Sequence, residues 1–201
     1  MKTIHILTEE ASLENVLKVV LPTILPGDIT FKVHPHNGKQ DLEKAIQYIV
    51  PALSKIPNSR ILIVRDQDSA DCRILKQELL NLTTPVCSSP FLVRIVCHEL
   101  ENWFLGDLEA IQAAFPRFKA DNYRGKSKFR SPDTIRGAVE ELRRIIPQYA
   151  SRQYLPKLEV SEKIAAHMVI DRNKSISFQQ FMKGIIKLAT NPAIPDYTTG
   201  D

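Results

Sequence analysis

Four short apolar runs in the first half of the chain alternate with segments of helical periodicity, and this alternation constrains the fold more than any other feature. The runs are rich in β-branched residues, as buried strands are, and they span residues 3–7, 29–33, 60–65 and 91–97. Between them, apolar residues recur at spacings of three and four, which predicts helices over residues 13–25, 41–55 and 70–82. Strands that alternate with helices form a parallel or mostly parallel sheet, so we expect an α/β fold.

The second half of the chain changes character after Cys97, because it shows helical periodicity without a convincing strand. Ser131 and Pro132 are typical of a helix start, a capping hydroxyl followed by proline, and Ser177 is expected to cap the last helix likewise. The helices are predicted over residues 107–115, 132–146, 160–168 and 177–188. We therefore expect an α/β core over residues 1–107 and a helical portion over residues 108–201, packed on the core as one compact unit.

The composition is that of a globular protein, with 201 residues, 43% hydrophobic residues and a formal net charge of +4. No apolar run approaches the roughly 20 residues that span a bilayer, and acids follow the N-terminus too soon for a secretory signal. The three cysteines, Cys72, Cys87 and Cys97, form no CxxC pair and leave an odd thiol, which fits a reducing compartment. We expect a cytoplasmic protein without a membrane partner.

The third apolar run ends in two acids, Asp66 and Asp68, one residue apart. In an extended chain these residues point the same way, so both carboxylates would project together from the end of the strand. Carboxylates a few Å apart repel each other, and a hard cation such as Mg²⁺ removes that cost. The alternative is that the two acids open a solvated turn or cap the helix that follows.

Carboxylates also follow the first and fourth runs, as Glu9, Glu99 and Glu101. Because ligands bind at the carboxyl ends of parallel strands, we expect these acids to join the aspartates in one cluster. Glu99 and Glu101 share a face only if their segment is extended, and lie roughly 200° apart if it is helical. Trp103 and Phe104 follow at once and are expected to anchor this turn in the core.

A basic segment runs from Arg117 to Arg130, with a single acid, Asp121, among its six basic residues and three aromatic ones. Such a segment can track a phosphate backbone and stack on exposed bases. The alternative is a solvated loop with a few buried aromatic side chains. The residues predicted to bind nucleic acid are Arg124, Lys126, Lys128 and Arg130, and the interleaved aromatic residues are Phe118, Tyr123 and Phe129.

Three blocks of the sequence resemble the prokaryotic proteins of domain of unknown function family 4276, which are Toprim-like. The order and spacing of these blocks match the family, as does the C-terminal half, and the blocks are residues 9–14, 66–72 and 98–107. The resemblance implies a Toprim-like sheet in the core and a nuclease related to the overcoming-lysogenization-defect type. It further implies the following roles: Glu9 as general acid or base, Asp66 and Asp68 as ligands of Mg²⁺ or Mn²⁺, and Glu99 and Glu101 as accessory ligands.

Metal-dependent cleavage of phosphodiester bonds in nucleic acid, in a phage-defence or mobile-element system, is the function that the resemblance implies. Two departures from the Toprim pattern, Glu10 in place of glycine and Leu13 in place of a second acid, favour an alternative. This alternative is a non-catalytic module that acts with an ATPase partner. A phosphatase of the haloacid-dehalogenase type also has Asp-x-Asp after a strand, but it expects threonine where this chain has Ala70. The residues do not distinguish DNA from RNA.

Overall fold

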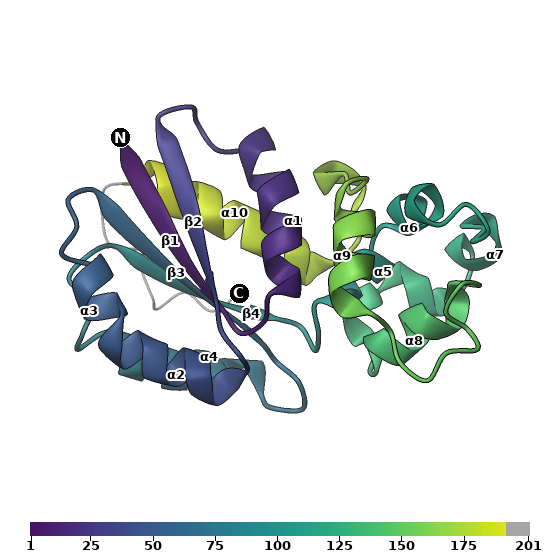
Figure 1. The fold of residues 1–201 in the computed structure, drawn as a ribbon, viewed down its shortest axis with the longest axis horizontal. Coiled ribbons are helices and arrows are strands. Elements are labelled where there is room, and N and C mark those ends of the chain that lie inside the picture. The colour runs from purple at the N-terminus through teal and green to yellow at the C-terminus, as the bar shows by residue number, and fades with distance from the viewer. Residues whose placement is uncertain (192–201) are drawn as a thin grey trace.

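A parallel sheet forms the centre of the protein in the computed structural model, which describes residues 1–191. Its four strands lie in the order β2-β1-β3-β4 and all neighbours are parallel (Figure 1). The strands are β1 (Lys2–Thr8), β2 (Ile29–Pro35), β3 (Ser59–Asp66) and β4 (Phe91–Val96). The predicted α/β class and the four predicted strands are therefore confirmed.

Helices cover both faces of this sheet. The face covered by α1 and α10 takes Leu62 and Val64 of β3, whereas the face covered by α2, α3 and α4 takes Ile61 and Ile63. Successive side chains of a strand point to opposite faces, so burial on both sides explains why the run is continuously apolar. The helices are α1 (Ser12–Val20), α2 (Lys39–Tyr48), α3 (Val50–Leu53), α4 (Cys72–Thr83) and α10 (Ile176–Thr190).

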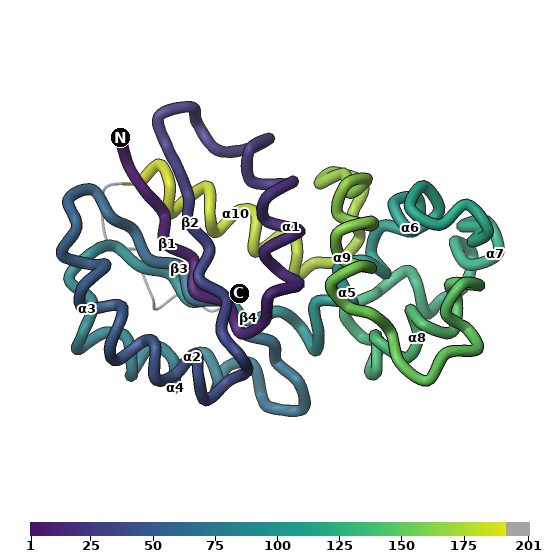
Figure 2. The backbone as a smooth tube through the Cα atoms, in the orientation of Figure 1, coloured from purple at the N-terminus to yellow at the C-terminus, as the bar shows by residue number. Residues whose placement is uncertain are grey.

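The helical half of the chain, apart from its last helix α10, forms a lobe beside the sheet (Figure 2). Helix α9 lies between this lobe and α1, against which it packs. The helices are α5 (Glu101–Leu105), α6 (Leu108–Ala114), α7 (Asp121–Arg124), α8 (Ala138–Ile145) and α9 (Lys157–Ala165), and 3₁₀ turns span Leu21–Thr23, Ser127–Arg130, Pro132–Thr134 and Ile170–Arg172. Residues 192–201, the end of the predicted helical portion, lie outside the described residues. None of the described helices combines the length and apolar character needed to cross a membrane.

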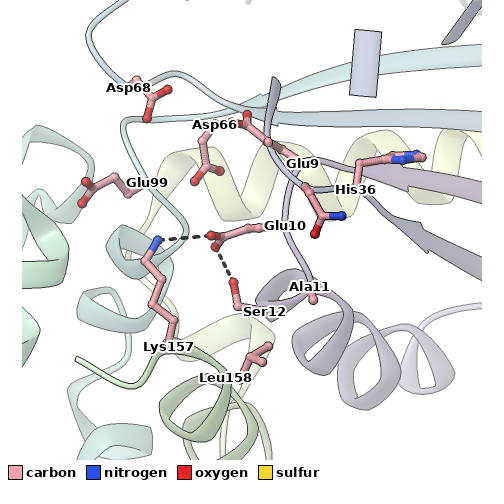
Figure 3. A pocket seen from close by; sticks show the side chains of 12 residues that line it. Glu9, Glu10, Ala11, Ser12, His36, Asp66, Asp68, Glu99, Lys157 and Leu158 are labelled. Carbon is pink, nitrogen blue, oxygen red and sulfur yellow. Dashed lines mark hydrogen bonds and ion pairs between the residues drawn. The ribbon is translucent and has the colours of Figure 1, made fainter. Parts of the chain in front are cut away.

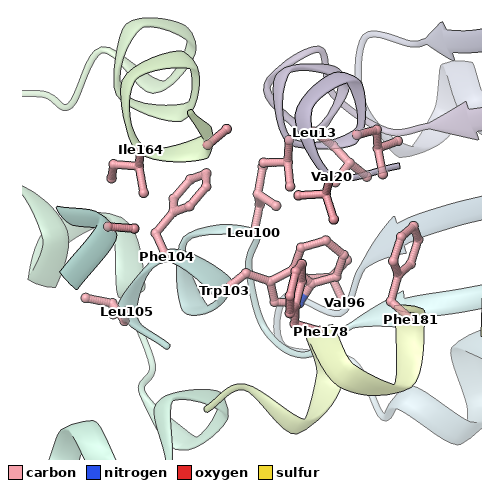
Figure 4. Packing of buried hydrophobic residues seen from close by; sticks show 14 of the residues in the cluster. Leu13, Val20, Val96, Leu100, Trp103, Phe104, Leu105, Ile164, Phe178 and Phe181 are labelled. Atoms are coloured by element: carbon pink, nitrogen blue, oxygen red, sulfur yellow. The ribbon is translucent and has the colours of Figure 1, made fainter. Parts of the chain in front are cut away.

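The last helix returns the chain to the sheet, where α10 packs on β4 and β3. Trp103 of α5 joins the two halves, since its ring centroid lies 5.1 Å from that of Phe178 and 5.1 Å from that of Phe181 (Figure 4). Trp103 and Phe104 are 0% and 1% exposed, so the predicted anchoring of this turn in the core is confirmed. One hydrophobic cluster therefore extends from the sheet into the helical lobe.

Two details of the predicted helices are wrong. The helix predicted over residues 132–146 is broken at Gly137, whose φ of 65° is left-handed, so that a 3₁₀ turn and α8 take its place. The last helix is capped by Ser175, whose hydroxyl accepts a hydrogen bond of 3.0 Å from the Phe178 N–H. Ser177 instead accepts hydrogen bonds from the Cys97 N–H and the Trp103 indole, contacts across the chain that local sequence does not reveal.

Candidate functional site

The strand order creates a crevice between the carboxyl ends of β1 and β3. The chain leaves β1 toward β2 on one side and leaves β3 toward β4 on the other, and such a switch of direction is where ligands bind in open α/β sheets. A pocket of about 460 Å³ lies there (Figure 3). It is lined by Glu9, Glu10, Ala11, Ser12, His36, Asn37, Gly38, Asp66, Asp68, Glu99, Lys157 and Leu158.

Asp66 ends β3 and lines the pocket. Two-residue periodicity puts its side chain on the same face as Leu62 and Val64, the face that α1 and α10 cover. Its Oδ2 accepts a hydrogen bond of 3.3 Å from the Leu100 N–H. Burial raises the pKa of Asp66 well above its ordinary value, and the carboxylates of Glu10, Glu101 and Glu9 raise it further. The ionised form is therefore costly without an additional positive charge.

Asp68 reaches the same pocket by a different geometry from the predicted one. The extended chain ends at Asp66, and Asp68 has a left-handed φ of 52° in the turn that follows. Its N–H donates to the His98 carbonyl at 2.9 Å, and His98, also left-handed, has its Nδ1 3.3 Å from the Asp68 carbonyl oxygen. The extended backbone expected at Asp68 is therefore wrong, but both carboxylates still line the pocket. The cap of α4 is Asp71, which accepts from the Arg73 N–H at 2.8 Å.

Glu9 directly follows β1 and lies beside Asp66, which ends the neighbouring strand β3 (Figure 3). Its Oε2 is buried without a hydrogen-bond partner among residues 1–191, and the Nε of Arg65 lies 3.7 Å away. Arg65 is itself held by Glu43 of α2, at 2.7 Å. Burial raises the pKa of Glu9 and the Asp68 carboxylate adds to this effect, while Arg65 opposes it. A carboxyl group with a raised pKa is suited to proton transfer.

Glu99 and Glu101 separate, because α5 begins at Glu101 and the segment is not extended. Glu99 lines the pocket, and its Oε2 accepts a hydrogen bond of 3.2 Å from the Val139 N–H. Glu101 is 1% exposed and does not line the pocket in the described residues. Burial raises the pKa of Glu101 to about 7, even though the ammonium of Lys157 lowers it.

Lys157 and Glu10 are the two charged residues of this pocket that sequence reasoning did not assign to it. The Lys157 Nζ lies 3.2 Å from the Glu10 Oε2 and 3.5 Å from the Glu101 Oε1. Glu10 also accepts a hydrogen bond from the Ser12 hydroxyl. Glu10 could have been found from its place beside Glu9, whereas nothing near Lys157 signals its role. More than 140 residues separate it from Glu10, and only the packing of α9 on α1 brings them together.

The aromatic side chains of the basic segment belong to the core. Phe118 and Phe129 are 1% and 2% exposed, and Tyr123 stacks on Phe118 with 5.0 Å between ring centroids. Tyr123 also meets the edge of Phe129 at 5.5 Å. The prediction that Phe118 and Phe129 stack on bases is therefore wrong, because the alternative of buried aromatics holds for both.

The four basic residues predicted to bind nucleic acid lie on the surface of the lobe, and none of them is among the described residues that line the pocket. Arg124 pairs with Glu109 at 2.7 Å, and Lys128 pairs with the buried Glu141 at 2.7 Å. The Nζ of Lys126 lies 4.5 Å from the centre of the Tyr123 ring, and Arg130 is exposed. Their contact with nucleic acid stays a prediction.

The carboxylate oxygens of the pocket are of the type that hard divalent cations bind, but they are not arranged as a preformed metal site. Within residues 1–191, no group of three or more His, Cys, Asp or Glu side chains is close enough together to hold a metal ion. Mg²⁺ commonly binds through one or two carboxylates and completes its shell with water and substrate phosphate. Oε2 of Glu9, which lines the pocket, is buried and lacks a hydrogen-bond partner among the described residues, so the pocket has an oxygen atom to offer.

The fold and the pocket together define a parallel α/β protein with an acidic site at the carboxyl edge of its sheet. The family model described as "Domain of unknown function (DUF4276)" matches residues 8–186. The chain therefore belongs to this family, which confirms the resemblance at the level of the family. No curated protein and no solved structure matches the chain.

Proposed function

We propose that this protein is a Mg²⁺- or Mn²⁺-dependent nuclease of Toprim-like type, which cleaves phosphodiester bonds in nucleic acid. The observation that carries the proposal is the charge imbalance of the pocket. Among its described lining residues, five carboxylates face a single ammonium, that of Lys157. Carboxylates crowded into one pocket repel one another, and they are retained at that cost mainly where they bind a cation or move a proton.

The proposed ligands are Asp66, Asp68 and Glu99, which reach the pocket from the end of β3 and from the turn after β4. A bound divalent ion would supply stabilisation of the negative charge that develops on the phosphate oxygens. Glu101 is too enclosed to line the pocket and pairs with Lys157 at 3.5 Å, so as an accessory ligand it would have to exchange this ammonium for the cation.

Glu9 is the proposed general acid or base. It lines the pocket, its pKa is raised by burial, and Arg65 holds it in place. Lys157 supplies the ammonium among the described lining residues and is therefore the group suited to pair with a phosphate oxygen. Arg124, Lys126, Lys128 and Arg130 remain proposed contacts for nucleic acid outside the pocket.

Calorimetry with Mg²⁺ and Mn²⁺, together with a cleavage screen over plasmid, single-stranded DNA and RNA, tests this function. Asp66→Asn is expected to lose the heat of metal binding and all cleavage, because it removes the enclosed carboxylate at the centre of the pocket. Glu9→Gln is expected to bind metal and lose cleavage. Asp28→Asn, which changes an exposed acid outside the pocket, is the matched control and is expected to behave as wild type. Unchanged metal affinity in Asp66→Asn would contradict the proposal.

A non-catalytic module that acts with an ATPase partner is the second candidate. Two observations favour this second candidate. Lys157 already supplies a positive charge to Glu10 and Glu101, and the described residues contain no group of three or more ligand side chains close enough to hold a metal ion. This candidate expects no metal-dependent heat and no cleavage by the wild-type protein. The same calorimetry therefore separates the two functions.

A further inference from the structure

The pocket is walled on two opposite sides by segments that are fixed to the fold. One wall is the start of α9, with Lys157 and Leu158, and the other is the loop between β2 and α2, with His36 and Gly38. The α9 wall is tied to α1, because the Asn15 side-chain amide donates to the Leu158 carbonyl at 3.2 Å and to the Ser161 hydroxyl at 2.9 Å. The loop wall is tied to the end of β1, because the His36 N–H donates to the Thr8 carbonyl at 2.9 Å and the Gly38 N–H to the Glu9 carbonyl at 3.0 Å. Hydrogen bonds to the rest of the fold therefore hold both walls.

The volume of the pocket indicates the size of group that it can hold. About 460 Å³ lies in the lower part of the range for sites that enclose one small-molecule ligand, which corresponds to one nucleotide rather than to stacked base pairs. In a duplex, a nucleotide enters such a pocket only after it is unstacked and unpaired, which costs free energy. A nucleotide of a single strand is already unpaired, so the pocket is expected to bind single strands more tightly than a duplex.

Leu158 gives the pocket an apolar contact surface. It lines the pocket near Ser12 and Lys157 (Figure 3), and 56% of it is exposed. An exposed leucine does not stabilise the neighbouring carboxylates or Lys157, whereas the sugar or base attached to a bound phosphate would cover its apolar surface. The side chain is therefore suited to recognise the apolar part of a nucleotide.

The two parts of the chain that meet at the pocket differ in net charge. Residues 108–174, which include α9, carry 14 Lys and Arg against 8 Asp and Glu, whereas residues 1–107 carry 11 against 13. A strand whose scissile phosphate lies at Asp66 and whose next nucleotide passes Leu158 would leave the pocket on the basic side. Phosphate contacts of this kind need no particular sequence and weaken with salt.

We infer that the pocket takes one nucleotide of a single-stranded nucleic acid, with its phosphate at the acidic base and its sugar or base against Leu158. This inference rests on the proposed function, because it names the substrate class of the same site. It adds a specificity-determining residue that does not take part in the chemistry.

Fluorescence anisotropy with labelled oligonucleotides tests the inference, using a single-stranded DNA, an RNA of the same sequence and the blunt duplex, each in Ca²⁺. We expect the single strands to bind at least tenfold more tightly than the duplex. Leu158→Ala is expected to weaken single-strand binding roughly fivefold, since about half of a leucine surface is left to be covered. Ile74→Ala is the matched control, because Ile74 is 62% exposed on α4 and is not a lining residue.

Equal affinity for the duplex, or equal behaviour of Leu158→Ala and Ile74→Ala, would overturn the inference. A melting curve of each variant shows whether the fold is intact, as expected for exposed side chains. Preferential binding of single strands without any cleavage in Mg²⁺ would support the inference and contradict the nuclease proposal, so the two failures are distinguishable.

Discussion

Glu101→Gln is expected to stabilise the protein at neutral and alkaline pH. Burial raises the pKa of Glu101 from its ordinary value of 4.5 to about 7, so the folded state binds this proton more tightly than the unfolded state does. The stability that the bound proton contributes is fully present below pH 4.5 and is lost as the pH rises through 7. Glutamine cannot ionise, so the variant avoids this loss.

The size of the effect follows from the shift in pKa. One pKa unit corresponds to 1.36 kcal/mol, so a rise from 4.5 to about 7 amounts to about 3 kcal/mol above pH 7 and almost nothing at pH 4. For a chain of 201 residues, this corresponds to an increase in melting temperature of roughly 6 to 12 °C at pH 8. The assay is urea unfolding of wild type and variant between pH 4 and pH 8, with EDTA present so that no cation offsets the charge.

Glu141→Gln is the matched control, since Glu141 is a buried glutamate with the opposite shift. Burial alone would raise the pKa of Glu141, but hydrogen bonds from Arg144 and Lys128 outweigh it and lower the pKa. Its contribution is present above the ordinary carboxyl pKa and is lost as the pH falls, so the variant should be less stable than wild type at pH 8 and approach it in acid. A stability difference for Glu101→Gln that does not change with pH would refute the reasoning.

Two further predictions concern the junction between sheet and lobe. Asp107→Asn is expected to destabilise the protein by about 3 kcal/mol or more in urea unfolding. Buried Asp107 accepts two hydrogen bonds from Arg172, at 2.7 and 3.0 Å, and the variant lacks the negative charge that pairs with this guanidinium. An unchanged midpoint would contradict this. Gly106→Ala is expected to cost about 2 kcal/mol, although alanine usually stabilises helices, because its methyl group would overlap the Asn173 Oδ1 and displace a side chain that bonds the Trp103 carbonyl. A rise in melting temperature would show that Asn173 yields freely.

The sequence by itself determined the fold class. Strands and helices differ in hydrophobic period, and the apolar run at residues 60–65 is buried on both faces only in a sheet that helices cover on both sides. It also determined that carboxylates gather at one edge, because parallel strands all end there and Glu9, Asp66 and Glu99 follow three of them. Both are local properties, because the spacing of apolar residues and the position of acids after them can be read from the sequence.

Local sequence could not determine how the residues around the pocket are held. Left-handed backbone at Asp68 and His98 turned each segment away from its extended path, and the start of α5 at Glu101 placed that acid in the core. The serine that caps α10 was likewise decided by contacts across the chain, since Ser177 bonds Cys97 and Trp103.

Only the tertiary structure decided the electrostatics of the pocket. Lys157 follows Glu10 by more than 140 residues, and it reaches the acids because α9 packs on α1. That packing also leaves Leu158 at the wall of the pocket, while burial of Glu101 raises its pKa against the opposing effect of Lys157. A charge, its counterion and the surface beside them acquire their properties from distance in space and from burial, which no spacing along the chain specifies.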